Sequence, residues 1–161
     1  MHDPPHLSTL SAPDTAESIE PVDQARLTRF LGFRLTRIEL RLHRQFVDCV
    51  KALDLKPVDF SLLVLVDANA GINQRQLSEV LDVSPPNLAI VVARLVKRRL
   101  LRQVRGTQDR RMQHLYLTAS GKTLLGKAEI DVMRLEDQFA LGLSASEAKV
   151  LQRVLDKLDR A

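Results

Sequence analysis

The sequence has little of the chemistry from which disulfide scaffolds, metal centres and many enzymes are built. Cys49 is the only cysteine among 161 residues, so an internal disulfide is excluded. The four histidines form no pair of metal ligands on a helix, and neither a glycine-rich phosphate loop nor a Gly-x-Ser-x-Gly motif is present. We therefore predict no metal site, no cofactor, no catalytic residue and no enzymatic activity.

Long apolar runs are also missing. The longest, residues 60–66, is interrupted by Ser61 and is much shorter than a membrane span. Residues 1–21 hold four of the seven prolines and lack the cationic and apolar segments of a secretion signal. We expect a cytoplasmic protein with no membrane partner, in which residues 1–21 form a disordered N-terminal tail.

Positive charge is concentrated in one short segment. The net charge is only +4, but residues 94–111 contain eight basic residues and a single acid, Asp109. A basic focus on an otherwise slightly acidic chain indicates a polyanionic partner. From charge alone, a solvated arginine-rich face is as good an interpretation as a surface that binds a polyanion.

Residues 22–55 are predicted to form a dimerisation helix. This segment contains one glycine, and its apolar residues fall at steps of three and four, with a second apolar line at Phe33, Leu40 and Val47. The combined apolar surface is wider than one partner helix needs. A helix of this length spans about 45 Å, so we expect part of it to pack against a second copy of the chain.

Residues 56–118 show the pattern of a helix-turn-helix followed by a hairpin. Helices are predicted over residues 58–70, 74–81 and 84–98. Asn73 and Gln76 form a capping-box pair at the start of the second helix, which is expected to bury Leu77 and Val80. Two extended arms around the polar tip 106–111 predict a β-hairpin, and a basic hairpin in this position is a wing.

Residues 119–161 are predicted to add two helices to the dimerisation region. Thr118 is suited to cap a helix that ends at about Leu141, before Gly142. Ser144 with Glu147 is a second capping box, and it opens a final amphipathic helix.

This order of elements resembles the MarR family of bacterial regulators. The motifs that carry the resemblance are Leu77-Ser78-Glu79-Val80-Leu81-Asp82-Val83-Ser84, Leu95-Val96-Lys97-Arg98-Arg99-Leu100-Leu101, Asp109-Arg110-Arg111 and Leu115-Tyr116-Leu117-Thr118-Ala119-Ser120-Gly121. The resemblance covers about residues 22–160. It implies a mainly helical winged helix-turn-helix fold with a β-hairpin wing, and a short strand before the helix-turn-helix. It also implies a homodimer, double-stranded DNA as partner, and a small ligand, often an aromatic acid, that weakens DNA binding.

The helix after Ser84 is the expected recognition helix. Its predicted DNA contacts are Ser84, Pro86, Asn87, Ala89, Ile90, Arg94 and Lys97. Asn87 can pair bidentately with adenine, whereas Ala89 and Ile90 can only contact thymine methyl groups or permit close approach. Ser84 and the helix N-terminus are expected to meet a phosphate. Alternatively, Ile90 belongs to the core and the outward face is rotated.

The chain departs from the family pattern on this helix. Many members have Thr and Arg where this chain has Ala89 and Ile90, Asp in place of Ala93, and Gly in place of Arg99. These differences concern how bases are read rather than the fold.

The wing tip is the second expected contact with DNA. Arg110 and Arg111 suit a narrow minor groove, and Asp109 is expected to anchor the wing by pairing with a nearby arginine. Without the resemblance, these three residues would be interpreted as a solvated turn.

An arginine stripe on the first helix is the candidate effector site. Arg34, Arg37, Arg41 and Arg44 lie at steps of three or four, with His43 beside them. The resemblance implies that a small acid binds near these helices, and a guanidinium can hold a carboxylate bidentately. We predict that Arg34, Arg37 or Arg41 anchors an anionic effector. The alternatives are a solvated face, ion pairs with Glu39 and Asp48, and a place for His43 at the dimer surface.

Two further alternatives remain open at this point. Cys49 could sense peroxide, but its apolar neighbours Val47 and Val50 favour a packing role. The chain as a whole could be a winged-helix protein-interaction module without DNA readout, for which the apolar residues Ala89, Ile90 and Ala93 would be suited.

Overall fold

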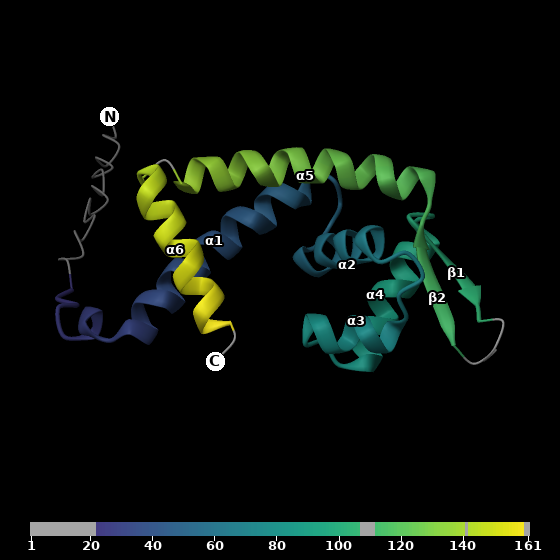
Figure 1. Ribbon diagram of the computed structural model, residues 1–161, viewed down its shortest axis with the longest axis horizontal. Helices are drawn as coiled ribbons and strands as arrows, with labels where there is room; N and C mark the ends of the chain where they lie inside the picture. Colours follow the sequence, from purple (N-terminus) through teal and green to yellow (C-terminus); the bar gives the residue numbers. More distant parts are fainter. Residues whose placement is uncertain (1–21, 107–111, 141, 160–161) are drawn as a thin grey trace, which may run out of the picture. The chain divides into compact units, whose positions relative to one another are not determined.

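The computed structural model describes residues 22–106, 112–140 and 142–159 (Figure 1). Internal contacts divide the chain into two units, residues 1–37 and 38–161. The described part of the first unit contains a 3-10 turn, η1 (Leu27–Arg29), and the first turns of helix α1 (Leu31–Lys51). All other helices and strands belong to the second unit.

Helix α1 begins later than the sequence pattern predicted. Between residue 22 and the start of α1, side chains form local hydrogen bonds: Asp23 Oδ1 accepts from the N–H of Ala25 at 2.8 Å, and the Thr28 hydroxyl donates to the carbonyl of Ala25 at 3.1 Å. Such local bonds compete with helix formation. Phe30, which follows η1, has an extended backbone and separates the turn from the helix.

Besides Val50 of α1 and the later residues Leu125 and Ala128, three helices and a hairpin form the core of the second unit. They are α2 (Pro57–Ala68), α3 (Gln74–Leu81), α4 (Pro85–Lys97), β1 (Leu101–Arg105) and β2 (Gln113–Leu117). Helix α2 contacts α3, α4 and β2, and α4 contacts α3 and β1 (Figure 1). The fully buried side chains include Leu62, Leu63, Leu77, Leu88, Leu95 and Leu115.

The hairpin is joined to the segment before α3. Strands β1 and β2 are antiparallel, with Leu101 opposite Leu117 and Arg105 opposite Gln113. Asn73 forms a bridge with His114, and the N–H of Leu115 donates to the carbonyl of Ile72 at 2.9 Å. This segment therefore takes the place of the short strand that the family resemblance implied.

Helix α5 (Ala119–Ala140) starts on the hairpin side of the core. Thr118 caps it, since its hydroxyl oxygen accepts the N–H of Gly121 at 3.0 Å. A Cβ on Gly121 would lie 2.1 Å from the carbonyl oxygen of Leu100, so only glycine allows this close approach. Helix α6 (Ala145–Leu158) opens with the predicted Ser144–Glu147 capping box and buries none of its residues.

The mainly helical winged helix-turn-helix architecture is confirmed, but one core prediction is wrong. Val80 is 64% exposed, whereas Leu77 is fully buried and Leu81 packs against the core. Residues four apart lie on the same helix face, so α3 uses Leu77 and Leu81 and turns Val80 outward. Among the residues that the structure describes, none of the helices combines the length and the hydropathy of a membrane span.

Candidate nucleic-acid interface

Helix α4 presents a clear division between a core face and an outward face. Leu88, Val91, Val92 and Leu95 are buried. The exposed residues on the other side are Ser84, Pro86, Asn87, Ala89, Ile90, Ala93 and Lys97. Ile90 is 64% exposed, so the alternative that assigned it to the core is wrong. The predicted contacts other than Arg94 thus share one solvent-facing surface.

The first turn of α4 has few backbone donors. Ser84 is the N-cap residue, but its side chain makes no capping hydrogen bond. Pro85 and Pro86 have no N–H group, so Asn87 alone supplies one in the first three helical positions. Any phosphate at this helix end must therefore be held mainly by the Ser84 hydroxyl and the Asn87 N–H.

Arg94 lies differently from the sequence prediction. Its guanidinium forms an ion pair with the carboxylate of Asp59, whose side chain is 1% exposed. The second carboxylate oxygen of Asp59 accepts the N–H of Lys56 at 2.8 Å. Arg94 therefore neutralises a buried charge at the start of α2, and the structure turns its guanidinium toward the protein rather than outward with Ile90 and Lys97.

Arg98, just after α4, also binds within the protein. It donates to the carbonyl of Leu53 at 3.1 Å and to the carbonyl of Asp54, and it lies 3.5 Å from the Asp54 carboxylate. Arg94 thus attaches the recognition helix to the start of α2, and Arg98 attaches it to the segment that joins α1 and α2. Sequence reasoning missed these contacts because the partners are 35 to 45 residues apart. The one available signal was Asp59 itself, an acid between Val58 and Phe60 in a helix predicted to be mostly buried.

The hairpin carries exposed cations on its described strands. Arg102 and Arg105 of β1 are exposed, and the Arg102 guanidinium lies 4.4 Å from the centre of the Tyr116 ring. His114 Nδ1 donates to the carbonyl of Gly71 at 2.7 Å and so helps to hold β2 against the segment before α3. The predicted tip residues Asp109, Arg110 and Arg111 lie outside the described residues.

The candidate effector residues fall in both units, and each unit is described by itself. In the first, Arg34 and Arg37 are exposed, and Arg37 donates to the side chain of Gln24 and lies 5.8 Å from the centre of the Phe33 ring. In the second, the predicted candidates Arg41 and His43 are exposed.

Arg41 and His43 each lie near one other side chain of the second unit. Arg41 lies 5.9 Å from the centre of the Phe139 ring, and His43 Nδ1 lies 3.9 Å from the Glu39 carboxylate. Within the described residues, no three His, Cys, Asp or Glu side chains are grouped as metal ligands.

Cys49 is half-buried on α1. Burial, and secondarily the charge of Asp131, raises the pKa of its thiol above the ordinary value. A raised pKa lowers the thiolate population that reacts with peroxide. This environment supports the packing role over a redox role.

The comparisons with known proteins agree with this geometry. The sequence profile of the MarR family matches residues 53–112. A protein of Thauera aromatica, assigned to transcriptional regulation of the hcr operon, is 30% identical over 131 residues, which are 81% of this chain and 79% of that protein.

Solved structures of the transcriptional repressor CouR have the same fold. CouR bound to a 23-mer DNA duplex superimposes with a TM-score of 0.82 at 32% identity, covering 86% of this chain and 99% of CouR. CouR bound to p-coumaroyl-CoA gives 0.76 at 30% identity, covering 87% and 99%. With the exposed face of α4 and the basic hairpin, these similarities identify the chain as a member of the MarR family of DNA-binding winged helix-turn-helix transcriptional regulators.

Proposed function

We propose that the protein is a homodimeric repressor that binds a pseudo-palindromic DNA site and is released by a small anionic effector such as an aromatic acid. The observation that carries the DNA part is the outward face of α4, which joins Asn87, Ile90 and Lys97 beside a hairpin whose described strand β1 exposes two arginines. In such an arrangement the recognition helix enters the major groove and the wing reaches the flanking minor groove.

The terminal helix supports a dimer. Helix α6 exposes a continuous apolar stripe of Val150, Leu151, Val154, Leu155 and Leu158, each between 39% and 54% exposed. An apolar stripe of this kind on a capped helix is expected to be covered in solution. A second copy of the chain is the proposed cover, and a two-fold dimer would read two half-sites about one helical turn apart.

The wing assignment is tested with Arg110→Ala. We expect DNA affinity to fall by about 1–3 kcal/mol and the slope of log affinity against log salt to decrease by about one per wing. Binding is measured by fluorescence anisotropy on duplexes selected from a random library, between 50 and 200 mM salt as in ordinary salt titrations. Unchanged affinity and slope would refute the wing assignment, and a footprint on a single half-site would refute the dimeric reading of DNA.

The effector proposal starts from the arginine stripe. CouR, which is similar to this chain, has been solved with an aromatic acyl-CoA. In this chain the Arg41 guanidinium beside Phe139 combines a cation with an aromatic surface, and Arg34 and Arg37 are further candidates to hold a carboxylate. Hydroxybenzoates, cinnamates and their CoA thioesters are the compounds to test. A melting temperature and a DNA affinity that none of them changes would overturn this part.

A further inference from the structure

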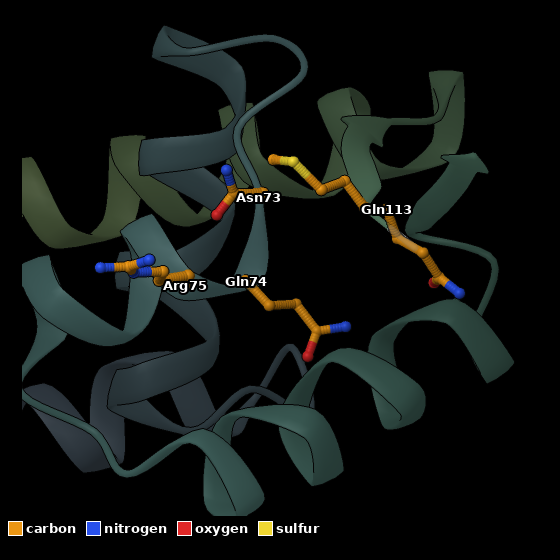
Figure 2. A pocket seen from close by; sticks show the side chains of 5 residues that line it. Asn73, Gln74, Arg75 and Gln113 are labelled. Atoms are coloured by element: carbon orange, nitrogen blue, oxygen red, sulfur yellow. The ribbon is translucent and has the colours of Figure 1, made fainter. Parts of the chain in front are cut away.

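A hollow of about 520 Å³ lies between the start of α3 and the start of β2 (Figure 2). It is lined by Asn73, Gln74, Arg75, Met112 and Gln113. The Asn73–His114 bridge brings these two segments together, although they are about forty residues apart in the sequence. Figure 2 shows the Gln74 and Gln113 side chains extending from the two segments in a similar direction.

The lining includes hydrogen-bond donors and no side chain that carries a negative charge. Three of its five side chains are amides, one is a guanidinium and none is an acid. Asn73 is occupied in the capping box with Gln76, and Arg75 pairs with Glu79 at 3.0 Å. Among the residues that the structure describes, the amides of Gln74 and Gln113 have no hydrogen-bond partner.

The hairpin places a cation next to this hollow. Arg105 is directly opposite Gln113 in the β1–β2 register and is exposed. Opposite residues of an antiparallel pair project on the same face with their Cβ atoms about 5 Å apart. Leu115 and Leu117, which share the face of Gln113, are buried in the core, so this face of the hairpin is directed toward the helices.

We propose that this hollow holds the sugar-phosphate backbone of the bound duplex, with Gln74 and Gln113 donating hydrogen bonds to phosphate oxygens. The inference rests on the proposed DNA-binding mode and adds contacts to it. The first helix of a helix-turn-helix crosses the DNA backbone, and the hollow joins the start of that helix to the wing. Neutral amides and a neighbouring arginine bind phosphate oxygens without reading sequence, so these residues fix the position of the protein on DNA.

The test uses four single variants of the full-length protein. Gln74→Met and Gln113→Met remove the donor at nearly constant side-chain length, and Gln74→Glu and Gln113→Glu place a negative charge against the backbone. Gln138→Glu on α5 is the matched control, because Gln138 is exposed and far from the hairpin. The rise per residue places it about 25 Å along the helix from Gly121, which lies in the first turn of α5 after β2. Melting temperature and circular dichroism establish that each variant is folded.

Affinities are measured on a duplex selected by the wild-type protein and on a scrambled duplex of the same composition, at low salt. Each Gln→Met variant is expected to weaken binding roughly tenfold, the value of a hydrogen bond to a charged group. The loss should be similar on both duplexes, because a phosphate contact carries no sequence information. Gln74→Glu and Gln113→Glu should weaken binding further, and Gln138→Glu should stay close to wild type.

The outcomes separate this inference from the proposed function. If the wild-type protein binds the selected duplex and the four variants bind as tightly, the backbone site is wrong and the DNA-binding mode stands. A loss confined to the selected duplex would assign Gln74 and Gln113 to base reading and also overturn the inference. A wild-type protein that binds neither duplex would refute the proposed function itself.

Discussion

Helices α3 and α6 begin with the same kind of capping box but differ in how far their apolar residues are buried. Each opens with a reciprocal capping box, Asn73–Gln76 in α3 and Ser144–Glu147 in α6. The eight-residue α3 buries Leu77 completely, whereas the fourteen-residue α6 buries nothing and leaves Leu155 49% exposed. Local signals therefore make a helix in both places. Among the described residues, the core of the winged lobe extends from Val50 near the end of α1 to Ala128 in α5, and α6 adds no buried residue to it.

The largest expected difference in stability between the lobe and α6 concerns the buried ion pair of Arg94 with Asp59. Arg94→Met leaves the carboxylate of Asp59 buried and unpaired, so we expect a loss of about 3–5 kcal/mol in the free energy of unfolding. Urea denaturation measures it. The double variant Asp59→Leu with Arg94→Met should recover most of the loss, because it removes both charges.

A matched change on α6 serves as the control for this pair. Lys157→Met removes an exposed charge and should change stability by less than about 0.5 kcal/mol. Equal effects of Arg94→Met and Lys157→Met would show that the Asp59 pair does not hold the lobe together.

Two leucine substitutions test whether the lobe is stabilised by its own core and α6 by contact with a second copy of the chain. Leu95→Ala in the lobe should cost about 2–5 kcal/mol at every protein concentration, because it empties a fully buried site. Leu155→Asp on α6 should instead dissociate the proposed dimer, so that the melting temperature no longer rises with protein concentration as it does for a dimer. Light scattering reports the dimer directly. A Leu155→Asp protein that keeps the wild-type molar mass would contradict the proposal that the apolar face of α6 forms the dimer interface.

A smaller effect is expected at the turn between α4 and β1. Arg99 has a φ of +58°, and its carbonyl accepts the hydroxyls of Thr118 at 2.6 Å and Ser120 at 2.8 Å. Arg99→Gly relieves the left-handed strain but adds freedom to the unfolded chain, so the net gain should be about 0.5–1 kcal/mol. Arg102→Gly, in the adjoining strand, should destabilise the protein instead. Thermal unfolding of both variants decides whether the backbone at residue 99 is strained.

The smallest expected effect is a difference between the two capping boxes in how their stability depends on pH. Hydrogen bonds from Ser144 lower the pKa of Glu147 below its ordinary value of 4.5. The capping contribution is therefore complete above pH 4.5 and is lost as the pH falls through the lowered pKa. The Asn73–Gln76 box has no titrating group. Residue-resolved hydrogen exchange should show the start of α6, but not the start of α3, opening on acidification, and Glu147→Gln should abolish this pH dependence.

Local patterns predicted a good part of this fold. Both capping boxes, the helix after Ser84 and the hairpin pairing follow from contacts between residues close in sequence, and the structure contains all of them. The exposed face of α4 also follows, since Leu88, Val92 and Leu95 fix its orientation. The start of α1 and the burial of Val80 were wrong, because side-chain hydrogen bonds in one case and the packing of a short helix in the other override periodicity.

The division into a dimerisation region and a DNA-binding lobe stays a prediction, as do the roles of Arg110 and Arg111. The family, the kind of partner and the outward residues of the recognition helix were determined by the sequence itself, through motifs that each span fewer than ten residues. The ion pair of Arg94 with Asp59 and the placing of Gln74 and Gln113 on the lining of one hollow were decided only by the tertiary structure. Chain segments some 35 to 45 residues apart must pack before a buried carboxylate can select its arginine, and no local pattern encodes that choice.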